Sequence, residues 1–219
     1  GLIPSLKITN DFDETGSFDA PIGTQEVWAA GVTYLRSKVA REKESAEEGG
    51  SSFYDKVYNA ERPELFFKSQ PYRVSGHQAD VFIRHDSTWD VPEPELTLFI
   101  SSAGTIEGYS VGNDMSSRSI EGQNPLYLAQ AKVYDKAAAI GPCLSVLESP
   151  IESNAIIQLK IYRNDLLAFD GTTSVSQIKR ELTELVSYLF RETTFNQGVM
   201  LMTGTGIIPQ DDFTLQVGD

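Results

Sequence analysis

The feature that most constrains the fold is a pair of β-rich hairpin patterns downstream of residue 92. Runs of β-branched and apolar residues at Glu93–Ile100 and Ile106–Val111 flank a short Ser-Ser-Ala-Gly-Thr segment. A second pair, Ala155–Tyr162 and Leu166–Phe169, flanks Arg-Asn-Asp. Such runs, separated by a few turn-forming residues, are typical of antiparallel hairpins. The sequence therefore predicts an α+β domain that is dominated by β-structure.

Weaker signals complete this outline. Val27–Tyr34 and Gly198–Met202 are short apolar runs that predict strands, and Arg36–Glu48 has a helical composition. Thr203–Gly206 predicts a tight turn. Ser174-x-x-Gln177 resembles a capping box, and it would open an amphipathic helix whose apolar side is formed by Ile178, Leu182, Leu185, Val186 and Leu189.

Charge and composition narrow the class of partner. The net charge of −13 over 219 residues argues against nucleic acid, because phosphate binding needs clustered Lys and Arg. The longest apolar runs fall well short of the roughly 18 residues that a membrane span needs, and no secretory signal precedes them. The single Cys143 fits a reducing compartment. We therefore expect a cytoplasmic protein with a small-molecule partner, and neither a nucleic-acid nor a membrane partner.

An acidic cluster is the main candidate for chemistry. Glu93 and Glu95 stand two residues apart in a predicted strand, so both carboxylates would project from the same face. Asp114 lies at the end of the partner strand. Three convergent carboxylates suit a hard cation, Mg²⁺ or alternatively Mn²⁺ or Ca²⁺, better than zinc. The alternative is a solvated edge strand, which Pro94 would favour.

Several motifs in a fixed order resemble the catalytic domain of the fumarylacetoacetate hydrolase superfamily. They are Glu93–Ile100, Ile106–Arg118 with its Gly-Asn-Asp, Lys132 with Gly141-Pro142, Met202–Gly206 and Leu215–Asp219. The resemblance covers roughly residues 27–219. It implies a distorted β-roll fold and a divalent metal on Glu93, Glu95 and Asp114. It also implies a homodimer or a higher homo-oligomer. We divide the chain into an N-terminal segment and lid-like region at residues 1–68, which we expect to be the end of a small N-terminal domain, and a catalytic β-roll domain at residues 69–219.

One departure from the family pattern indicates the type of reaction. Hydrolases of this family typically carry a water-activating His three residues after an Asn-Tyr or similar pair, and here Ser37 stands at that position. Ser alone is a poor general base near neutral pH. This departure, together with Gly31–Ser37 and Glu61–Lys68, resembles the 2-keto-3-deoxy-D-arabinonate dehydratase branch. It implies loss of water from a 2-keto-3-deoxy sugar acid to give 2,5-dioxopentanoate, with Mg²⁺ polarising the 2-oxo acid.

The resemblance also suggests the residues that move protons. Lys132 stands at the position of the family's catalytic lysine, and burial near a metal can lower a lysine pKa enough for proton exchange. Glu64 lies in the lid-like stretch, where its carboxyl group could serve as acid or base. The alternatives are an ordinary surface lysine and a solvated loop charge. Which of the two residues takes the proton from C3 stays open at this point.

Five further residues are candidates for substrate contacts. Arg36 and Arg118 could bind the carboxylate or the sugar hydroxyls, although a structural ion pair is an equal alternative. Gly204 and Thr205 could present a backbone N–H and a hydroxyl, or simply form a tight turn. Phe67, with its neighbour Phe66, could wall the pocket or belong to the core.

Three rival functions use the same residues. A C–C bond hydrolase of an acylpyruvate or of a 2,4-diketo-3-deoxy acid would need a base other than the missing His. An oxo-acid decarboxylase or tautomerase would use the metal without water. A metal-stabilised binding protein would carry a degenerate site, and the complete set of Glu93, Glu95, Asp114 and Lys132 argues against it.

Overall fold

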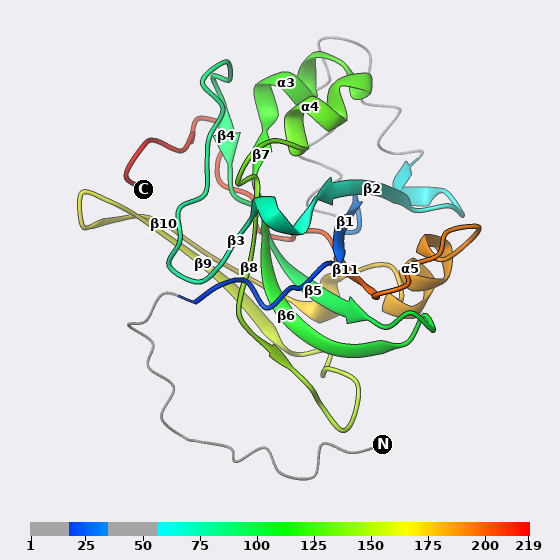
Figure 1. Ribbon diagram of the computed structural model, residues 1–219. Coiled ribbons are helices and arrows are strands. Elements are labelled where there is room, and N and C mark those ends of the chain that lie inside the picture. The colour runs from blue at the N-terminus through cyan, green and yellow to red at the C-terminus, as the bar shows by residue number, and fades with distance from the viewer. Residues whose placement is uncertain (1–17, 35–56) are drawn as a thin grey trace.

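The computed structural model describes residues 18–34 and 57–219. The predicted helix at Arg36–Glu48 lies outside these residues, as do Arg36 and Ser37. A curled seven-stranded sheet forms the body of the described chain (Figure 1), in the order β2-β1-β11-β5-β6-β8-β3. Its strands are β1 (Glu26–Gly31), β2 (Glu64–Ser69), β3 (Val74–Ser75), β5 (Pro94–Ile100), β6 (Ile106–Asp114), β8 (Ala138–Ser145) and β11 (Val199–Met202). The predicted β-dominated α+β class and rolled architecture are confirmed.

Both predicted hairpins are present. β5 pairs with β6 in antiparallel register, from Pro94 opposite Asn113 to Ile100 opposite Ile106. The second hairpin joins β9 (Ile156–Arg163) and β10 (Leu166–Ser174) in a sheet of their own. Two-residue strands β4 (Asp90–Val91) and β7 (Ser116–Ser117) form a third, minimal sheet.

β5 is an interior strand, and the edge-strand alternative for the acidic cluster is therefore wrong. It pairs with β11 on one side and with β6 on the other. Pro94 is tolerated because it is the first residue of β5, beyond the paired part of β11, where no donor to that neighbour is required. Glu93 and Glu95 consequently lie at the beginning of a strand that has a paired neighbour on each side.

The described helices are short. They are η2 (Pro71–Arg73), α3 (Arg118–Gln123), η3 (Pro125–Tyr127), α4 (Leu128–Lys132), η4 (Val175–Gln177) and α5 (Leu182–Leu189). The predicted capping box is wrong. Ser174 ends β10 and its hydroxyl is hydrogen-bonded to Ser176 Oγ, and α5 begins only at Leu182 without a side-chain cap. The predicted apolar side is confirmed for Leu185, Val186 and Leu189, which are buried, whereas Leu182 is half-buried and Ile178 lies before the helix.

The two faces of the sheet carry separate apolar clusters. One face packs against β9, β10 and α5 through a cluster that includes Leu96, Leu98, Leu185 and Leu201. The other face carries Val27, Ala29, Ala138, Ile140, Met200 and Met202. Strand alternation places Glu95 on this second face, two residues before Thr97, so the acidic cluster lies at one end of the smaller cluster.

The N-terminal part of the described chain is integrated into this sheet. β1 pairs in parallel with β11 and antiparallel with β2. β1 and all of β2 except Ser69 come from residues 1–68, whereas β11, the other neighbour of β1, comes from residues 69–219. The division of the chain at residue 68 stays a prediction. Among the described residues, no helix is long and apolar enough to cross a membrane.

Candidate active site

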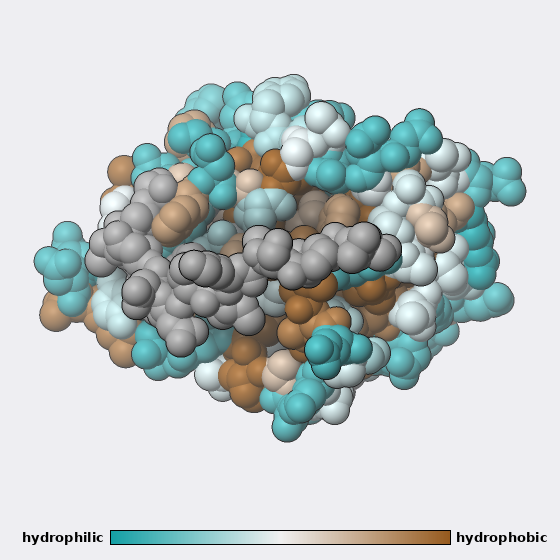
Figure 2. Space-filling view, turned by 60° about the horizontal axis from the view of Figure 1, so that its bottom comes forward, coloured by the Kyte–Doolittle hydropathy of each residue, from teal (hydrophilic) through white to brown (hydrophobic). Residues whose placement is uncertain are grey.

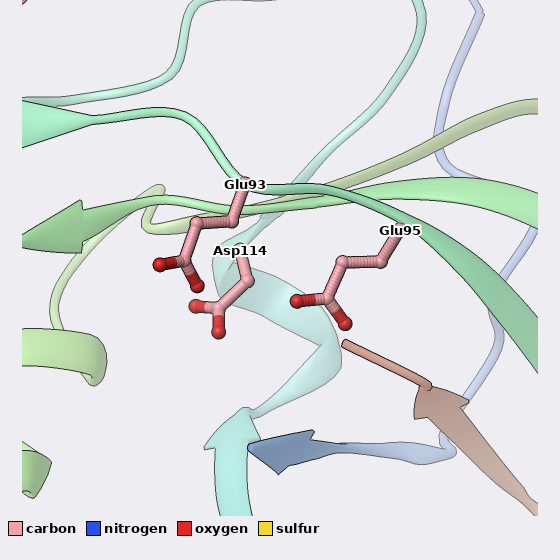
Figure 3. A group of neighbouring side chains, drawn as sticks. All are labelled: Glu93, Glu95 and Asp114. Carbon is pink, nitrogen blue, oxygen red and sulfur yellow. The ribbon is translucent and has the colours of Figure 1, made fainter. Parts of the chain in front are cut away.

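Three buried carboxylates meet at the end of the β5–β6 hairpin. Glu93 directly precedes β5, Glu95 lies within it, and Asp114 is the last residue of β6. One ligand oxygen from each residue lies within 4.8 Å of the others, and the side chains point into a common space (Figure 3). The backbone N–H of Asp114 donates to the Glu93 carbonyl at 2.9 Å, which fixes the two strand ends side by side. The hairpin register therefore brings together the three predicted metal ligands.

Buried cations surround two of these carboxylates. Lys132 Nζ lies 2.5 Å from Glu93 Oε2 and 2.9 Å from Asp114 Oδ2. Lys68 Nζ lies 2.5 Å from Asp114 Oδ1. The Arg118 guanidinium donates to Glu93 Oε1 at 2.8 Å. Burial of such charges is tolerated because each is paired and hydrogen-bonded.

Glu95 has a different environment. Its Oε2 atom accepts a hydrogen bond of 2.6 Å from the backbone N–H of Gly204. Burial, reinforced by the charges of Asp114 and Glu93, raises its pKa well above the usual value. Burial acts in the same direction on Asp114, but Lys132 and Lys68 outweigh it and lower the pKa of that carboxyl group. The cluster therefore contains one carboxyl group that is costly to ionise unless a further positive charge is present.

This combination of residues fits a divalent metal ion. The candidate ligands are all carboxylate oxygens, which Mg²⁺ and Mn²⁺ prefer. The pKa of Glu95 is raised first by burial and then by the negative charges of Asp114 and Glu93, and a bound cation would oppose both effects. Glu93, Glu95 and Asp114 would hold the ion. Bound there, the ion would supply the positive charge that ionised Glu95 requires.

Lys132 is buried, in contrast to the alternative of a surface lysine. It is the last residue of α4, and its side chain is fully enclosed. Besides the two carboxylates, its ammonium group donates to Ser116 Oγ at 2.6 Å. It lies 5.8 Å from the centre of the Phe66 ring. The structure thus places Lys132 directly at the acidic cluster.

Glu64 and the two phenylalanines belong to β2. Glu64 is half-buried opposite Gly31, and a Cβ atom at Gly31 would overlap the Glu64 carboxylate. Gly31 lines the pocket around the acidic cluster, so Glu64 lies at its margin rather than in a solvated loop. Phe66 lines this pocket, whereas Phe67 makes an edge contact with Trp28, which packs against the other cluster. Sequence reasoning selected both aromatic residues, and the structure brings Phe66 to the site.

The Thr203–Gly206 turn closes the pocket on the side of Glu95. Gly204 has a φ of +94°, a left-handed conformation that favours glycine. The Thr205 hydroxyl donates to the Pro94 carbonyl at 2.9 Å, which binds the turn to the start of β5. Both residues line the pocket, together with Ala30, Gly31, Val32, Phe66, Glu93, Glu95, Asp114 and Lys132. The tight turn is confirmed and it forms part of the pocket wall, but the Gly204 N–H and the Thr205 hydroxyl bond to Glu95 and Pro94, so their contact with a substrate stays a prediction.

Arg118 takes one of its two predicted roles, and Lys68 is a site residue that the sequence analysis missed. Arg118 is 2% exposed and its guanidinium pairs with Glu93, which is the structural ion-pair alternative. Lys68 was not a predicted site residue, yet it is fully buried and donates to the carbonyls of Met115 and Lys132 as well. Strand alternation offered a signal, because Lys68 lies two residues after Phe66 and four after Glu64.

Comparison with known proteins identifies the family. Residues 26–219 match the family described as "Fumarylacetoacetate (FAA) hydrolase C-terminal". The chain belongs to this family, as the predicted motifs indicated.

Two relatives and two solved structures are markedly similar. The chain is 46% identical over 200 residues to a probable 2-keto-3-deoxyxylonate dehydratase of Haloferax volcanii, covering 91% of this chain and 68% of that protein. It is 38% identical over 225 residues to 2-dehydro-3-deoxy-D-arabinonate dehydratase of Saccharolobus solfataricus, covering 100% of this chain and 72% of that protein.

The chain also resembles solved structures of dehydratases. A hexagonal crystal form of 2-keto-3-deoxyarabinonate dehydratase superposes with a TM-score of 0.81 at 38% identity, covering 90% of this chain and 67% of that chain. A 2-keto-3-deoxy-D-arabinonate dehydratase complexed with magnesium and 2,5-dioxopentanoate gives a TM-score of 0.77 at 37% identity, with coverages of 90% and 66%. The chain thus spans about two thirds of the length of these relatives.

Proposed function

We propose that this chain is a Mg²⁺-dependent dehydratase that removes water from a 2-keto-3-deoxy sugar acid, such as 2-keto-3-deoxy-D-arabinonate, to give 2,5-dioxopentanoate. The observation that carries the proposal is the buried Glu93–Glu95–Asp114 cluster with Lys132 hydrogen-bonded into it. Its support from outside the chain is the likeness to dehydratases, one of them complexed with magnesium and 2,5-dioxopentanoate.

The chemistry divides between the metal and the protein. Mg²⁺ would supply Lewis acidity, which acidifies the C3 protons of a 2-oxo acid. Lys132, whose ammonium group is enclosed beside two metal-ligand carboxylates, would exchange a proton with the substrate. Glu64 at the pocket margin would act as its acid or base partner. The leaving C4 hydroxyl needs a proton, and the C3 proton needs an acceptor, so two such groups suffice for elimination.

Substrate recognition would use the remaining pocket wall. Phe66 offers an apolar surface, and Gly204 and Thr205 form the opposite turn. Arg36 lies outside the described residues, and we propose it as a partner for the substrate carboxylate because guanidinium groups bind carboxylates through two parallel hydrogen bonds. Phe67 and Arg118 would act indirectly, Phe67 by packing behind β2 and Arg118 by orienting Glu93.

A direct assay tests this function. The purified protein is incubated with Mg²⁺ and each 2-keto-3-deoxypentonate, and the products are identified by mass spectrometry. We expect a product that has lost one water with its carbon chain intact. Release of pyruvate would instead identify a C–C bond hydrolase or aldolase. Release of carbon dioxide would identify a decarboxylase.

We also propose that the protein is a cytoplasmic homodimer or a higher homo-oligomer. Ile156, Tyr162, Leu166 and Leu167 of the β9–β10 hairpin are 50–73% exposed, a concentration of apolar side chains that favours burial in an interface. Figure 2 shows apolar residues gathered towards the middle of one face of the molecule. Light scattering after size exclusion should give at least twice the chain mass, and Leu166→Lys should reduce it. A monomeric wild-type protein contradicts the proposal.

The proposed compartment rests on Cys143, which is an exposed free thiol. Such a thiol persists most readily where glutathione and thioredoxin keep cysteines reduced. Cell fractionation with an antibody to the protein tests this, and recovery outside the cytoplasmic fraction contradicts it.

A further inference from the structure

Val32 has a strained backbone at the edge of the candidate active site. It directly follows β1, lines the pocket around the acidic cluster, and has a φ of +53°. A β-branched residue rarely adopts this left-handed conformation, and within residues 18–34 and 57–219 no other β-branched residue does so. Such strain persists only where the surrounding structure determines the conformation. The neighbours of Val32 must therefore hold this turn in place.

The side chain of Thr33 holds this turn in place. Its side chain is fully buried, and its hydroxyl donates to the carbonyl of Thr203 with 2.7 Å between the oxygens. Thr203 directly follows β11, the parallel neighbour of β1. The hydroxyl therefore joins the turns that leave two adjacent strands, although the two residues are 170 positions apart in sequence.

Gly204 is fitted closely against the same hydroxyl. A Cβ atom at Gly204 would overlap Thr33 Oγ1 and would lie 3.1 Å from the Ala30 carbonyl oxygen. With a φ of +94°, Gly204 directs its N–H to Glu95 Oε2 at 2.6 Å. A shift of the 203–204 peptide would consequently change the only backbone donor to Glu95 that the described chain provides.

We propose that Thr33 is a positioning residue of the metal centre. The Thr33 hydroxyl fixes the carbonyl of Thr203, which belongs to the same peptide group as the N–H of Gly204. This peptide group is therefore held with its N–H directed at Glu95, and the hydrogen bond orients the Glu95 carboxylate for the ion. The proposal rests on the proposed role of Glu95 as a metal ligand. Groups that orient a ligand in this way typically contribute ~10- to 100-fold to metal affinity.

Binding of Mn²⁺ alone tests the proposal without substrate. The affinity of the full chain is measured by electron paramagnetic resonance of free Mn²⁺, for wild type, Thr33→Val and Thr33→Ser. Valine keeps the shape of threonine but loses the donor, so we expect Thr33→Val to bind ~10- to 100-fold more weakly. Serine keeps the donor, and we expect its affinity to stay within about threefold of wild type. Thr33→Ala serves as a second hydroxyl-free variant in case valine unfolds the chain.

Ser110→Ala is the matched control. Ser110 is also buried on β6, and its hydroxyl donates to the Cys143 carbonyl at 2.9 Å, four residues away from Asp114 along the strand. The Ser110→Ala substitution should lower the unfolding temperature of the protein and leave its affinity for Mn²⁺ unchanged. Wild-type affinity in the hydroxyl-free Thr33 variants overturns the proposal, and so does an equal loss in Thr33→Ser.

The result is separable from the proposed enzymatic function. If wild type binds Mn²⁺ and Thr33→Val binds it weakly, Thr33 positions the metal centre even where no sugar acid is dehydrated. If wild type dehydrates its substrate and Thr33→Val binds Mn²⁺ normally, the enzymatic function stands and the role of Thr33 does not.

Discussion

Lys68 and Asp114 form an ion pair that is buried on both sides, with 2.5 Å between Nζ and Oδ1. Burial lowers the pKa of Lys68, and the charge of Asp114 opposes that effect. The same ammonium group holds the carbonyl of Lys132 at 2.5 Å. Lys68 thus connects the carboxylate of a candidate metal ligand, Asp114, with the backbone of the candidate catalytic lysine.

Replacing Lys68 by methionine should therefore destabilise the protein. Removing one partner of a buried ion pair typically costs about 3–5 kcal/mol, because the other charge loses its compensation. Lys132 also contacts Asp114, so we expect the lower end of that range. Urea unfolding measures the change. The exposed Lys160 provides a matched control, and Lys160→Met should stay within about 0.5 kcal/mol of wild type. Equal effects of the two substitutions would contradict this account.

The raised pKa of Glu95 predicts how stability depends on pH without metal. A carboxyl group with a raised folded-state pKa favours folding only while it is protonated. This contribution is complete below the unfolded-state pKa of 4.5 and disappears as the pH rises through the higher folded-state value. In EDTA, Glu95→Gln should consequently be more stable than wild type near pH 8, and the difference should shrink towards pH 4.

Thermal unfolding across this pH range checks the prediction, and a constant difference would contradict it. The lowered pKa of Asp114 predicts the opposite pH dependence. Its ionised carboxylate stabilises the fold at pH values above the unfolded-state pKa, and this stabilisation is lost as the pH falls through the lower folded-state pKa.

Metal binding should release protons from the cluster. The ion competes with the proton on Glu95, whose pKa is raised by burial, so more protons leave when the starting pH is lower. Isothermal titration of Mg²⁺ into the protein in buffers of different ionisation enthalpy measures the number released. Glu95→Gln should abolish most of this release and weaken binding, whereas Asp170→Asn on the exposed part of β10 should change neither. Identical heats in all buffers would exclude a protonated Glu95.

Glu64 should affect activity without affecting metal binding, whereas Lys132 should affect both. A positioned acid or base typically contributes about 10²- to 10⁴-fold, so Glu64→Gln should lower kcat by that amount. Glu64 is not a candidate ligand, and its variant should bind Mg²⁺ as wild type does. Lys132→Met should also lose activity, with a change in Mg²⁺ affinity because its ammonium group contacts Glu93 and Asp114. Glu61→Gln, three residues before Glu64 in the chain, serves as the control. A fully active Glu64→Gln variant would remove Glu64 from the mechanism.

The site was predictable from the sequence where strand periodicity and hairpin register determine it. Two-residue spacing puts Glu93 and Glu95 on one face, and the hairpin brings Asp114 beside them. The same periodicity places Phe66 and Phe67 on opposite faces of β2. Which of these two faces points towards the site depends on the pairing of β2 with β1.

Other features depend on contacts distant in sequence. Nothing local in Ser174–Gln177 shows that β10 continues to Ser174, or that only the three-residue helix η4 follows it before α5 begins at Leu182. The burial of Lys68 follows from Asp114 and from α4, which lie far along the chain. Local propensity describes the elements well, whereas tertiary packing decides which side chains reach the site.

The parallel pairing of β1 with β11 has a consequence for biosynthesis. The pocket wall combines residues at the end of β1 with the turn after β11, so a nascent chain cannot complete the metal centre until residues 199–205 have left the ribosome. Until then the carboxylates of Glu93 and Asp114 can meet in their hairpin, but Glu95 lacks the Gly204 amide. A ribosome-bound chain arrested before residue 199 should accordingly retain the hairpin and bind metal only weakly, and affinity would arise once the turn after β11 has emerged.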